Sequence, residues 1–377
     1  MTRLGILGGG QLAQMTAQAA IALGVEIAIF ERQPDSPASR LTHHHFAGDW
    51  ADPALLAAFA AACDAVTLEN EFVDAAVLRW LEARGLPVCP TSATLAAVQD
   101  KLTQKETMRA AGLPLPAFRA VATPDDVRAA AVDFGWPLLL KARRDGYDGY
   151  GNATLHSAAD IPAAWEKLGA GRGRALLAEA FAPFLRELAV MVVRGRDGQT
   201  ACYPVVETVQ QQHICHLVRA PAPVADTTAR QAAALARAAV AAVDGVGVFG
   251  VELFEMADGS VLYNEIAPRP HNSGHYTIEA CVTSQFENHI RAVLGWPLGA
   301  AALRAPAAVM VNVLGRHSGP AWPAGVAAAL AVPGAHLHIY AKREPRPGRK
   351  MGHVTALGAT LAEAEAVARR AADLLDL

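Results

Sequence analysis

The beginning of the chain places a triple-glycine turn between an apolar strand and a helix. Residues 3–7 form an apolar run, residues 8–10 form the turn, and residues 11–23 have the periodicity of a helix. A second apolar run follows at residues 25–30. This order predicts a βαβ unit, which requires a parallel sheet covered by helices.

The same alternation continues along the first quarter of the chain. Helices are expected at residues 53–62 and 75–84, and strands at residues 65–68 and 86–89. We therefore expect an α/β fold that begins with a Rossmann-like parallel sheet in residues 1–99.

Three further units are expected after this domain. Residues 100–178 contain an apolar strand followed by a glycine-rich loop, which is typical of a small α/β lid. Residues 179–305 contain longer strands and predict a larger mixed sheet, and residues 306–377 form a small C-terminal domain. Because 377 residues exceed one ordinary core, a ligand site between domains is expected.

Composition excludes several classes of protein. A net charge of −3 gives no basic field for nucleic acid. The five cysteines contain no C-x-x-C pair, so neither a disulfide nor a zinc site is expected. The start has no export signal and no segment is long and uncharged enough to cross a bilayer, so we expect a cytoplasmic protein with no membrane partner. The consecutive histidines 43–45 are assigned to a loop and cannot easily converge on one metal ion.

The glycine turn at residues 8–10 leaves two interpretations open. With Ala13 it satisfies the G-x-G-x-x-A pattern, and Glu31 lies where a ribose-binding acid is expected, which favours a dehydrogenase. Backbone N–H groups at the start of a helix also bind other anions.

A lysine and three glycines predict a polyphosphate site. Lys141 ends an apolar strand, and Gly146, Gly149 and Gly151 follow it at a spacing that lets a hairpin approach phosphates closely. A plain glycine-rich turn is the alternative.

Two carboxylates predict a magnesium site. Glu252 and Glu265 lie on two strands of an expected hairpin that turns at residues 258–259, and apolar residues flank both. Facing strands bring both acids into one cleft, where oxygen ligands hold Mg²⁺ against nucleotide phosphates. The dense polar run at residues 264–275 indicates substrate ligands beside this site.

Together these segments resemble the ATP-grasp superfamily, and within it the N5-carboxyaminoimidazole ribonucleotide synthetase family of purine biosynthesis. The resemblance spans essentially the whole chain and is carried by residues 5–12, 99–101 with Lys105, 146–149, 179–187, 264–275 and 349–353. It implies an ATP-grasp fold with a pre-ATP-grasp domain, a lid, a catalytic subdomain and a C-terminal domain that completes the substrate site.

The resemblance also implies roles for individual residues. Lys141, Tyr147 and Arg269 would act in catalysis, and Glu252 and Glu265 would hold Mg²⁺. ATP would be bound by Lys101, Lys141, Gly146, Tyr147, Asp148, Gly149, Tyr150, Gly151, Asn152, Glu179, Ala180, Phe181, Ala182, Glu187, Gln210, Asn264 and Glu265. Aminoimidazole ribonucleotide would be bound by Gln11, Glu71, Tyr147, Arg269, His271, Asn272, Ser273, Lys342, Arg349 and Lys350.

The activity implied is an ATP- and bicarbonate-dependent carboxylation of the amine of aminoimidazole ribonucleotide through carboxyphosphate, in a homodimeric ligase. Three positions depart from the family pattern. Tyr150 replaces a cation, Asn152 replaces a glutamine and Gln210 replaces a histidine, so altered affinity is expected. The alternatives are a formate-dependent glycinamide ribonucleotide transformylase and a non-catalytic nucleotide-binding regulator.

Overall fold

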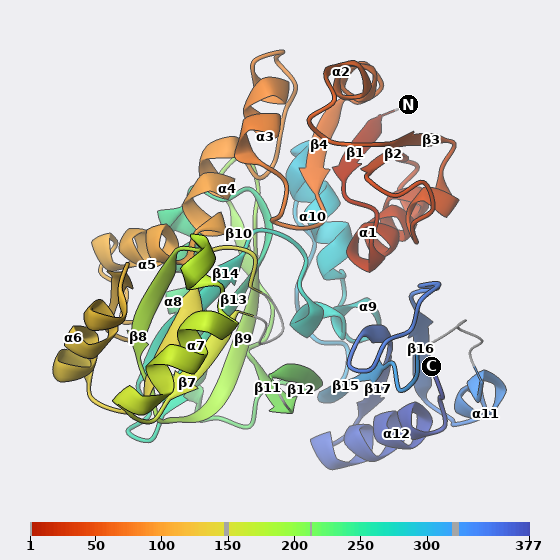
Figure 1. The fold of residues 1–377 in the computed structure, drawn as a ribbon. Helices are drawn as coiled ribbons and strands as arrows, with labels where there is room; N and C mark the ends of the chain where they lie inside the picture. The colour runs from red at the N-terminus through yellow and green to blue at the C-terminus, as the bar shows by residue number, and fades with distance from the viewer. Residues whose placement is uncertain (1, 147–150, 212, 319–323) are drawn as a thin grey trace.

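The computed structural model describes residues 2–146, 151–211, 213–318 and 324–377 (Figure 1). The first domain is a parallel sheet with strand order β3-β2-β1-β4. Its strands are β1 (Arg3–Leu7), β2 (Glu26–Glu31), β3 (His44–Ala47) and β4 (Ala65–Leu68), and its helices are α1 (Gln11–Ala22), α2 (Pro53–Ala61), α3 (Ala75–Glu82) and α4 (Ser92–Gln99). The Rossmann-like prediction is confirmed.

Two local predictions in this domain are wrong. Residues 86–89 contribute only an isolated bridge between Val66 and Val88 rather than a strand. Pro87 and Pro90 lack the N–H groups that a longer ladder would need. His44 and His45 lie in edge strand β3 rather than in a loop, where β3 pairs with β2.

The lid is a four-stranded antiparallel sheet with its own apolar core. Its strand β8 includes residue 179, at which the third unit was expected to begin, so the lid extends beyond the expected boundary. The strands are β5 (Phe118–Val121), β6 (Leu138–Ala142), β7 (Asn152–Leu155) and β8 (Leu176–Ala180), accompanied by helices α5 (Lys101–Ala110), α6 (Pro124–Phe134) and α7 (Ile161–Lys167).

One nine-stranded sheet joins the catalytic and C-terminal units, because β12 pairs directly with β15. Its strands are β9 (Phe184–Arg194), β10 (Thr200–Cys202), β11 (Val206–Gln211), β12 (Ile214–Ala220), β13 (Gly247–Met256), β14 (Val261–Ala267), β15 (Ala307–Leu314), β16 (Ala335–Ile339) and β17 (Lys350–Gly358). Its helices are α8 (Asp226–Ala242), α9 (Thr277–Ala280), α10 (Gln285–Leu294), α11 (Val326–Leu330) and α12 (Leu361–Asp373).

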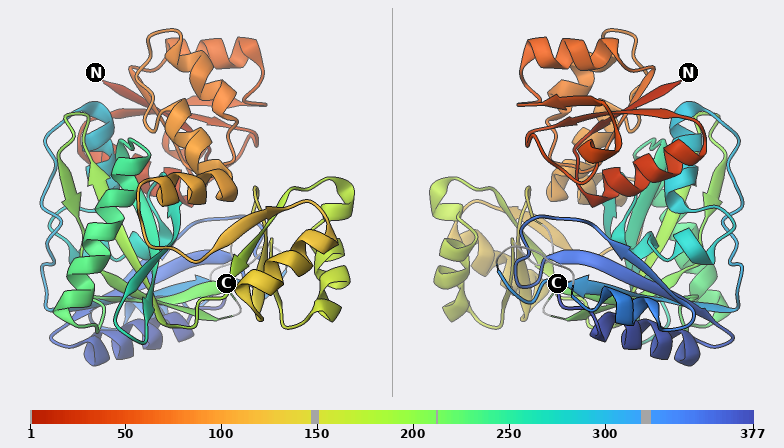
Figure 2. Two further views of the ribbon diagram at one scale, coloured as in Figure 1. Left: turned by 90° about the vertical axis from the view of Figure 1, so that its left-hand side faces the viewer. Right: turned by 90° about the vertical axis from the view of Figure 1, so that its right-hand side faces the viewer.

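Figure 2 shows the first domain above the large sheet and the lid to one side of both. Helix α10 packs on β13 and also on α1 of the first domain, so it joins these two parts. Among the described residues, no helix combines the length and the apolar character needed to cross a membrane.

Candidate active site

A cleft of about 960 Å³ lies where the first domain, the lid and the large sheet meet. The expected residues that line it are Gln11, Glu71, Lys101, Lys141, Gly146, Asn152, Phe181, Glu187, Gln210, Glu252, Asn264, Glu265, Arg269, His271, Asn272, Ser273, Arg349 and Lys350. Residues far apart in the sequence therefore converge on one space.

The remaining expected residues have other positions. Gly151, Glu179, Ala180, Ala182 and Lys342 are described but do not line the cleft. Lys342 lies next to it, because its Nζ donates to the backbone oxygen of Lys350 at 2.7 Å. Tyr147, Asp148, Gly149 and Tyr150 lie outside the described residues.

Lys141 is held at the cleft by a buried carboxylate. Its strand β6 pairs with β8, and its Nζ lies 2.7 Å from Oε1 of Glu179. The Nζ of Lys105, on α5, lies 2.5 Å from the other oxygen of Glu179. Burial alone would raise the pKa of Glu179, but the two ammonium groups lower it to about 2. Lys105 had no role assigned from the sequence, because an amphipathic helix does not reveal which buried lysine has a partner.

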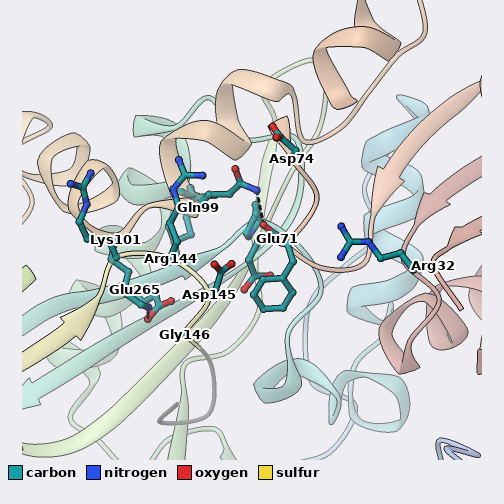
Figure 3. A pocket seen from close by; sticks show the side chains of 14 residues that line it. Arg32, Glu71, Asp74, Gln99, Lys101, Arg144, Asp145, Gly146 and Glu265 are labelled. Atoms are coloured by element: carbon teal, nitrogen blue, oxygen red, sulfur yellow. Dashed lines mark hydrogen bonds and ion pairs between the residues drawn. The ribbon is translucent and has the colours of Figure 1, made fainter. Parts of the chain in front are cut away.

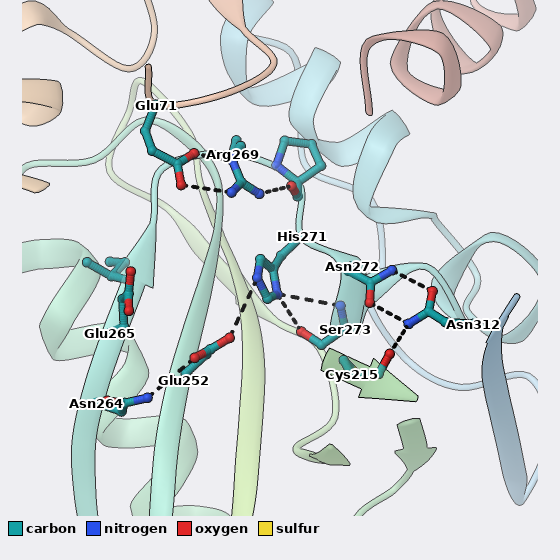
Figure 4. Close-up of polar contacts among 12 residues, drawn as sticks. Glu71, Cys215, Glu252, Asn264, Glu265, Arg269, His271, Asn272, Ser273 and Asn312 are labelled. Atoms are coloured by element: carbon teal, nitrogen blue, oxygen red, sulfur yellow. Dashed lines mark hydrogen bonds and ion pairs between the residues drawn. The ribbon is translucent and has the colours of Figure 1, made fainter. Parts of the chain in front are cut away.

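Glu252 and Glu265 face each other across the hairpin of β13 and β14, in direct register. The Nζ of Lys101 lies 2.5 Å from Glu265, and Asn264 Nδ2 donates to Glu252 at 3.4 Å (Figure 4). Desolvation in the cleft, together with the charges of Glu265 and Glu187, raises the pKa of Glu252 to about 7.

This pair of acids fits a hard divalent cation. Mg²⁺ is usually held by one or two carboxylates together with phosphate oxygens and water. Burial first, and the charge of Glu265 second, raise the pKa of Glu252, and a cation between the two carboxylates would compensate both effects. The donor set is therefore suited to Mg²⁺ that accompanies a nucleotide.

Glu187 and Gln210 lie together on neighbouring strands of the cleft. β9 and β11 pair, and the side chain of Gln210 donates a hydrogen bond to Glu187. Burial nevertheless raises the pKa of Glu187 above its ordinary value. Phe181, Phe184 and Phe254 also line the cleft, and Phe184 stacks on Phe254 with ring centroids 4.7 Å apart. Phe184 and Phe254 were not predicted as site residues. Phe184 could have been predicted, because it is an aromatic residue close in sequence to Phe181, which was expected to bind ATP.

The part of the cleft next to the acid pair of Glu252 and Glu265 is built by residues after β14, and His271 Nε2 lies 3.7 Å from Oε1 of Glu252. Arg269 makes a two-pronged ion pair with Glu71, which follows β4 of the first domain, and one of these contacts measures 2.9 Å (Figure 4). His271 Nδ1 lies 2.8 Å from Ser273 Oγ. Burial, Arg269 and Lys350 lower the pKa of His271 to about 3, so its imidazole is neutral near pH 7.

Asn272 is fixed by an amide pair that the sequence did not predict. Its Nδ2 donates to Asn312 Oδ1 at 2.9 Å, and Asn312 Nδ2 donates back to Asn272 Oδ1 at 2.7 Å. Asn312 lies on β15, so only the tertiary fold brings it to the cleft. This pair joins the catalytic part of the large sheet to its C-terminal part.

The glycine turn does not present a free anion site. The carboxylate of Glu31 accepts the backbone N–H of Gly9 at 2.6 Å, where a dinucleotide phosphate would otherwise bind. Glu69 packs against Gly8 and Gly10 from the other side. The dehydrogenase interpretation is therefore disfavoured, and the turn instead presents Gln11 to the cleft.

A smaller pocket of about 220 Å³ adjoins the cleft (Figure 3). It shares Glu71, Lys101 and Glu265 with the cleft and adds residues that include Arg32, Asp74, Gln99, Arg144 and Asp145. Gln99 Nε2 donates to the backbone oxygen of Glu71 at 2.7 Å, so this wall supports the residue that binds Arg269.

Three family models match consecutive parts of the chain. The ribonucleotide synthetase preATP-grasp domain matches residues 1–99, the ATP-grasp domain matches residues 106–286, and the phosphoribosylaminoimidazole carboxylase C-terminal domain matches residues 308–367.

Similar proteins carry closely related names. The N5-carboxyaminoimidazole ribonucleotide synthase of Synechococcus elongatus is 44% identical over 93% of this chain and 88% of its own length. The chloroplastic phosphoribosylaminoimidazole carboxylase of Vigna aconitifolia is 42% identical over 96% of this chain, which spans only 65% of that longer protein. A crystal structure of N5-carboxyaminoimidazole synthase from Aspergillus clavatus, in complex with ADP and 5-aminoimidazole ribonucleotide, has a TM-score of 0.90 and 39% identity, covering 99% of this chain and 98% of its own.

Proposed function

The chain belongs to the N5-carboxyaminoimidazole ribonucleotide synthase family of ATP-grasp proteins, and we propose that it uses ATP and bicarbonate to carboxylate the amine of aminoimidazole ribonucleotide. One observation carries this proposal. Two lysines, two facing acids and the Arg269 to Ser273 segment line a single cleft.

The proposed reaction has two steps. A bicarbonate oxygen attacks the γ-phosphorus of ATP, the bond to ADP breaks, and carboxyphosphate forms. The amine then attacks the carboxyl carbon and a C–N bond forms. The bond from this carbon to the bridging oxygen breaks, inorganic phosphate leaves with its electron pair, and the amine nitrogen releases one proton. The products are N5-carboxyaminoimidazole ribonucleotide, ADP and phosphate.

The side chains supply positioning and charge in the first step. Lys101 and Lys141 lie at the lid end of the cleft, where their charges favour the transferring phosphoryl group. Mg²⁺ held by Glu252 and Glu265 would add charge neutralisation at the phosphates. Arg269, bound to Glu71, is fixed in orientation and would stabilise the carboxyphosphate.

The second substrate is assigned to the other end of the cleft. The neutral His271, with Asn272 and Ser273, offers hydrogen bonds without adding charge, and Arg349 and Lys350 offer a cationic site for the ribose phosphate. Tyr147, which lies outside the described residues, keeps its predicted role only as an expectation. The homodimer and the cytoplasmic location also remain predictions.

A steady-state assay tests the proposed function. ADP release is measured with aminoimidazole ribonucleotide, with and without bicarbonate, and in parallel with glycinamide ribonucleotide and formate. We expect ADP only with the first amine and bicarbonate together. ADP that depends on formate would support the transformylase alternative, and ATP binding without amine-dependent ADP would support the non-catalytic regulator.

Replacement of one metal acid tests the assignment of Mg²⁺. Glu265→Gln should lower the rate of ADP formation by roughly 100-fold or more, because several kcal/mol of charge stabilisation are lost. Asp258→Asn, at the exposed tip of the same hairpin, is the control and should leave the rate unchanged. Full turnover in the folded Glu265→Gln variant would contradict the assignment.

A further inference from the structure

Three buried amide side chains each hold the backbone of one distant residue by a two-way hydrogen bond. Gln285 Nε2 donates to His271 O at 2.8 Å, and its Oε1 accepts His271 N–H at 3.0 Å. Gln104 Nε2 donates to Ile266 O at 3.2 Å, and its Oε1 accepts Ile266 N–H at 3.3 Å. Asn288 makes the same arrangement with Gly299, at 3.1 and 2.7 Å. In each case a side-chain amide takes the place of a neighbouring strand.

The two glutamines hold the segment that carries the site. β14 is an edge strand, so the outward N–H and C=O groups of Ile266 have no strand partner, and Gln104 takes both. The ladder of β14 ends at Ala267, and the chain then enters the cleft without sheet pairing. His271 lies beyond that end, and Gln285 supplies the backbone partner that the sheet no longer provides.

Each glutamine belongs to an element that serves a different end of the cleft. Gln104 lies on α5 between Lys101, which binds Glu265, and Lys105, whose Nζ donates to Asn264 O at 3.5 Å. All of these contacts concern the nucleotide and metal end.

Gln285 begins α10, which packs on the first domain. Its Nε2 also donates to His275 Nδ1 at 3.1 Å, and its backbone N–H donates to Thr277 Oγ1 at 2.9 Å. These contacts concern the end assigned to aminoimidazole ribonucleotide, and His271 marks where this end meets the metal acids, because its Nε2 lies 3.7 Å from Oε1 of Glu252. The side chain of His271 packs against Gly250 of β13, where a Cβ atom would overlap with it. The two-way hydrogen bond from Gln285 therefore fixes the imidazole as well as the backbone of His271.

We propose that Gln104 and Gln285 are positioning residues for different substrates, with Gln104 fixing the nucleotide end of residues 264–275 and Gln285 fixing the aminoimidazole ribonucleotide end. This inference rests on the proposed function. Neither side chain needs to touch a substrate, since each acts through the backbone of the residue that it holds.

The test compares Gln104→Met and Gln285→Met, which keep the side-chain length and remove the two-way hydrogen bond to the backbone. They also remove the hydrogen bonds of Gln104 with Val98 O and Tyr263 OH, and that of Gln285 with His275. Gln285→Met should raise KM for aminoimidazole ribonucleotide by on the order of 10- to 100-fold, because small displacements of positioned groups have effects of this size. Its KM for ATP should change by less than about three-fold. Gln104→Met should show the reverse pattern, with the larger change in KM for ATP.

Asn288→Leu is the matched control. It removes the same kind of clamp from the same helix as Gln285, but Gly299 lies outside the residues that line the cleft. This variant should lower the unfolding temperature as the Met variants do and leave both KM values unchanged. If a Met variant does not fold, Gln→Glu at that position keeps the acceptor and removes the donor. The changes in KM for ATP and in KM for aminoimidazole ribonucleotide are then compared in that variant.

Equal changes in both KM values for either glutamine variant, or a KM change in Asn288→Leu, would overturn the inference. Calorimetric titration with ADP separates it from the proposed function, because this binding needs no chemistry. Gln104→Met should weaken ADP binding and Gln285→Met should not. Wild-type protein that binds ADP but shows no amine-dependent turnover would refute the proposed function alone.

Discussion

The carboxylate of Glu179 is fully buried and lies between the ammonium groups of Lys105 and Lys141. A buried ion pair adds little net stability over an apolar replacement, but removal of one partner leaves an uncompensated charge. Here Glu179 compensates two charges, so it is the residue on which both lysines depend. It also holds Lys141 at the wall of the cleft.

Glu179→Gln should therefore destabilise the protein by roughly 3–5 kcal/mol, the usual effect of breaking a buried pair. Urea unfolding near pH 7 measures this value. Asp125→Asn, which removes an exposed partner of Arg128, is the control and should cost only about 0–1 kcal/mol. Similar values for the two variants would show that the lysines find other partners.

Single residues differ in how well the sequence predicts them. The meeting of Glu252 and Glu265 follows from strand alternation around a short hairpin, so it was predicted and the structure places them in register. The partnership of Glu179 with Lys105 was not predicted, because it depends on how α5 packs against the lid sheet. Asn312 was missed for the same reason, since β15 enters the site only through its pairing with β12.

Helix α10 is the element that connects the first domain to the large sheet. His289 is buried on this helix, accepts the backbone N–H of Val248 at Nδ1 with a distance of 3.0 Å, and contacts Thr67 Oγ1 through Nε2 at 2.8 Å. Since Nδ1 is an acceptor, Nε2 carries the proton and donates to Thr67. Burial lowers the pKa of His289 from 6.5 to about 4, so the neutral ring is part of the fold.

This histidine predicts a pH dependence of stability. The unfolded chain binds the proton more tightly, so the contribution of His289 is complete above about pH 6.5 and is lost as the pH falls toward about 4, by about 3 kcal/mol. His289→Gln should remove this part of the acid sensitivity in chemical unfolding, whereas His317→Gln, at an exposed position, should not. Equal acid sensitivity in wild type and His289→Gln would contradict the role.

The elements that the sequence predicted well are those with one strong local pattern. β1 and β4 have the predicted bounds because short apolar runs are bounded by turns. The longer strands expected in residues 179–305 are less regular, because β10 and β11 are separate strands with Pro204 between them. Edge strand β3 was missed because its half-buried histidines do not look like a strand until β2 pairs with them.

At the scale of the whole molecule, an ion pair and a hydrogen bond connect the C-terminal unit to the first domain beside the cleft. Asp35 makes an ion pair with Arg40 at 2.8 Å and another with Arg343, and Arg40 Nη1 donates to Ala341 O at 3.0 Å. The hydrogen bond from Arg40 is the main cause that lowers the pKa of Asp35. Ala341 has a φ of 52°, a left-handed conformation that is costly for alanine and is held by these contacts.

Asp35→Asn should loosen the loop that carries Lys342 and Arg349, which are both proposed to bind aminoimidazole ribonucleotide. We expect KM for aminoimidazole ribonucleotide to rise by up to about five-fold, the size of a partly exposed ion pair, and KM for ATP to stay constant. Added salt should bring wild type toward the variant. Glu26→Gln, which removes a pair within the first domain, is the control, and a KM unaffected by Asp35→Asn would contradict this role of the contact.

The central claim is that one cleft transfers a phosphoryl group to bicarbonate and then the carboxyl group to the amine. Bicarbonate labelled with oxygen-18, freshly dissolved and mixed with enzyme, ATP and aminoimidazole ribonucleotide, tests it directly by mass spectrometry of the phosphate. Carboxyphosphate leaves its bridging oxygen on phosphorus, so each phosphate should carry one labelled oxygen. Phosphate without label, formed together with the carboxylated product, would contradict the claim.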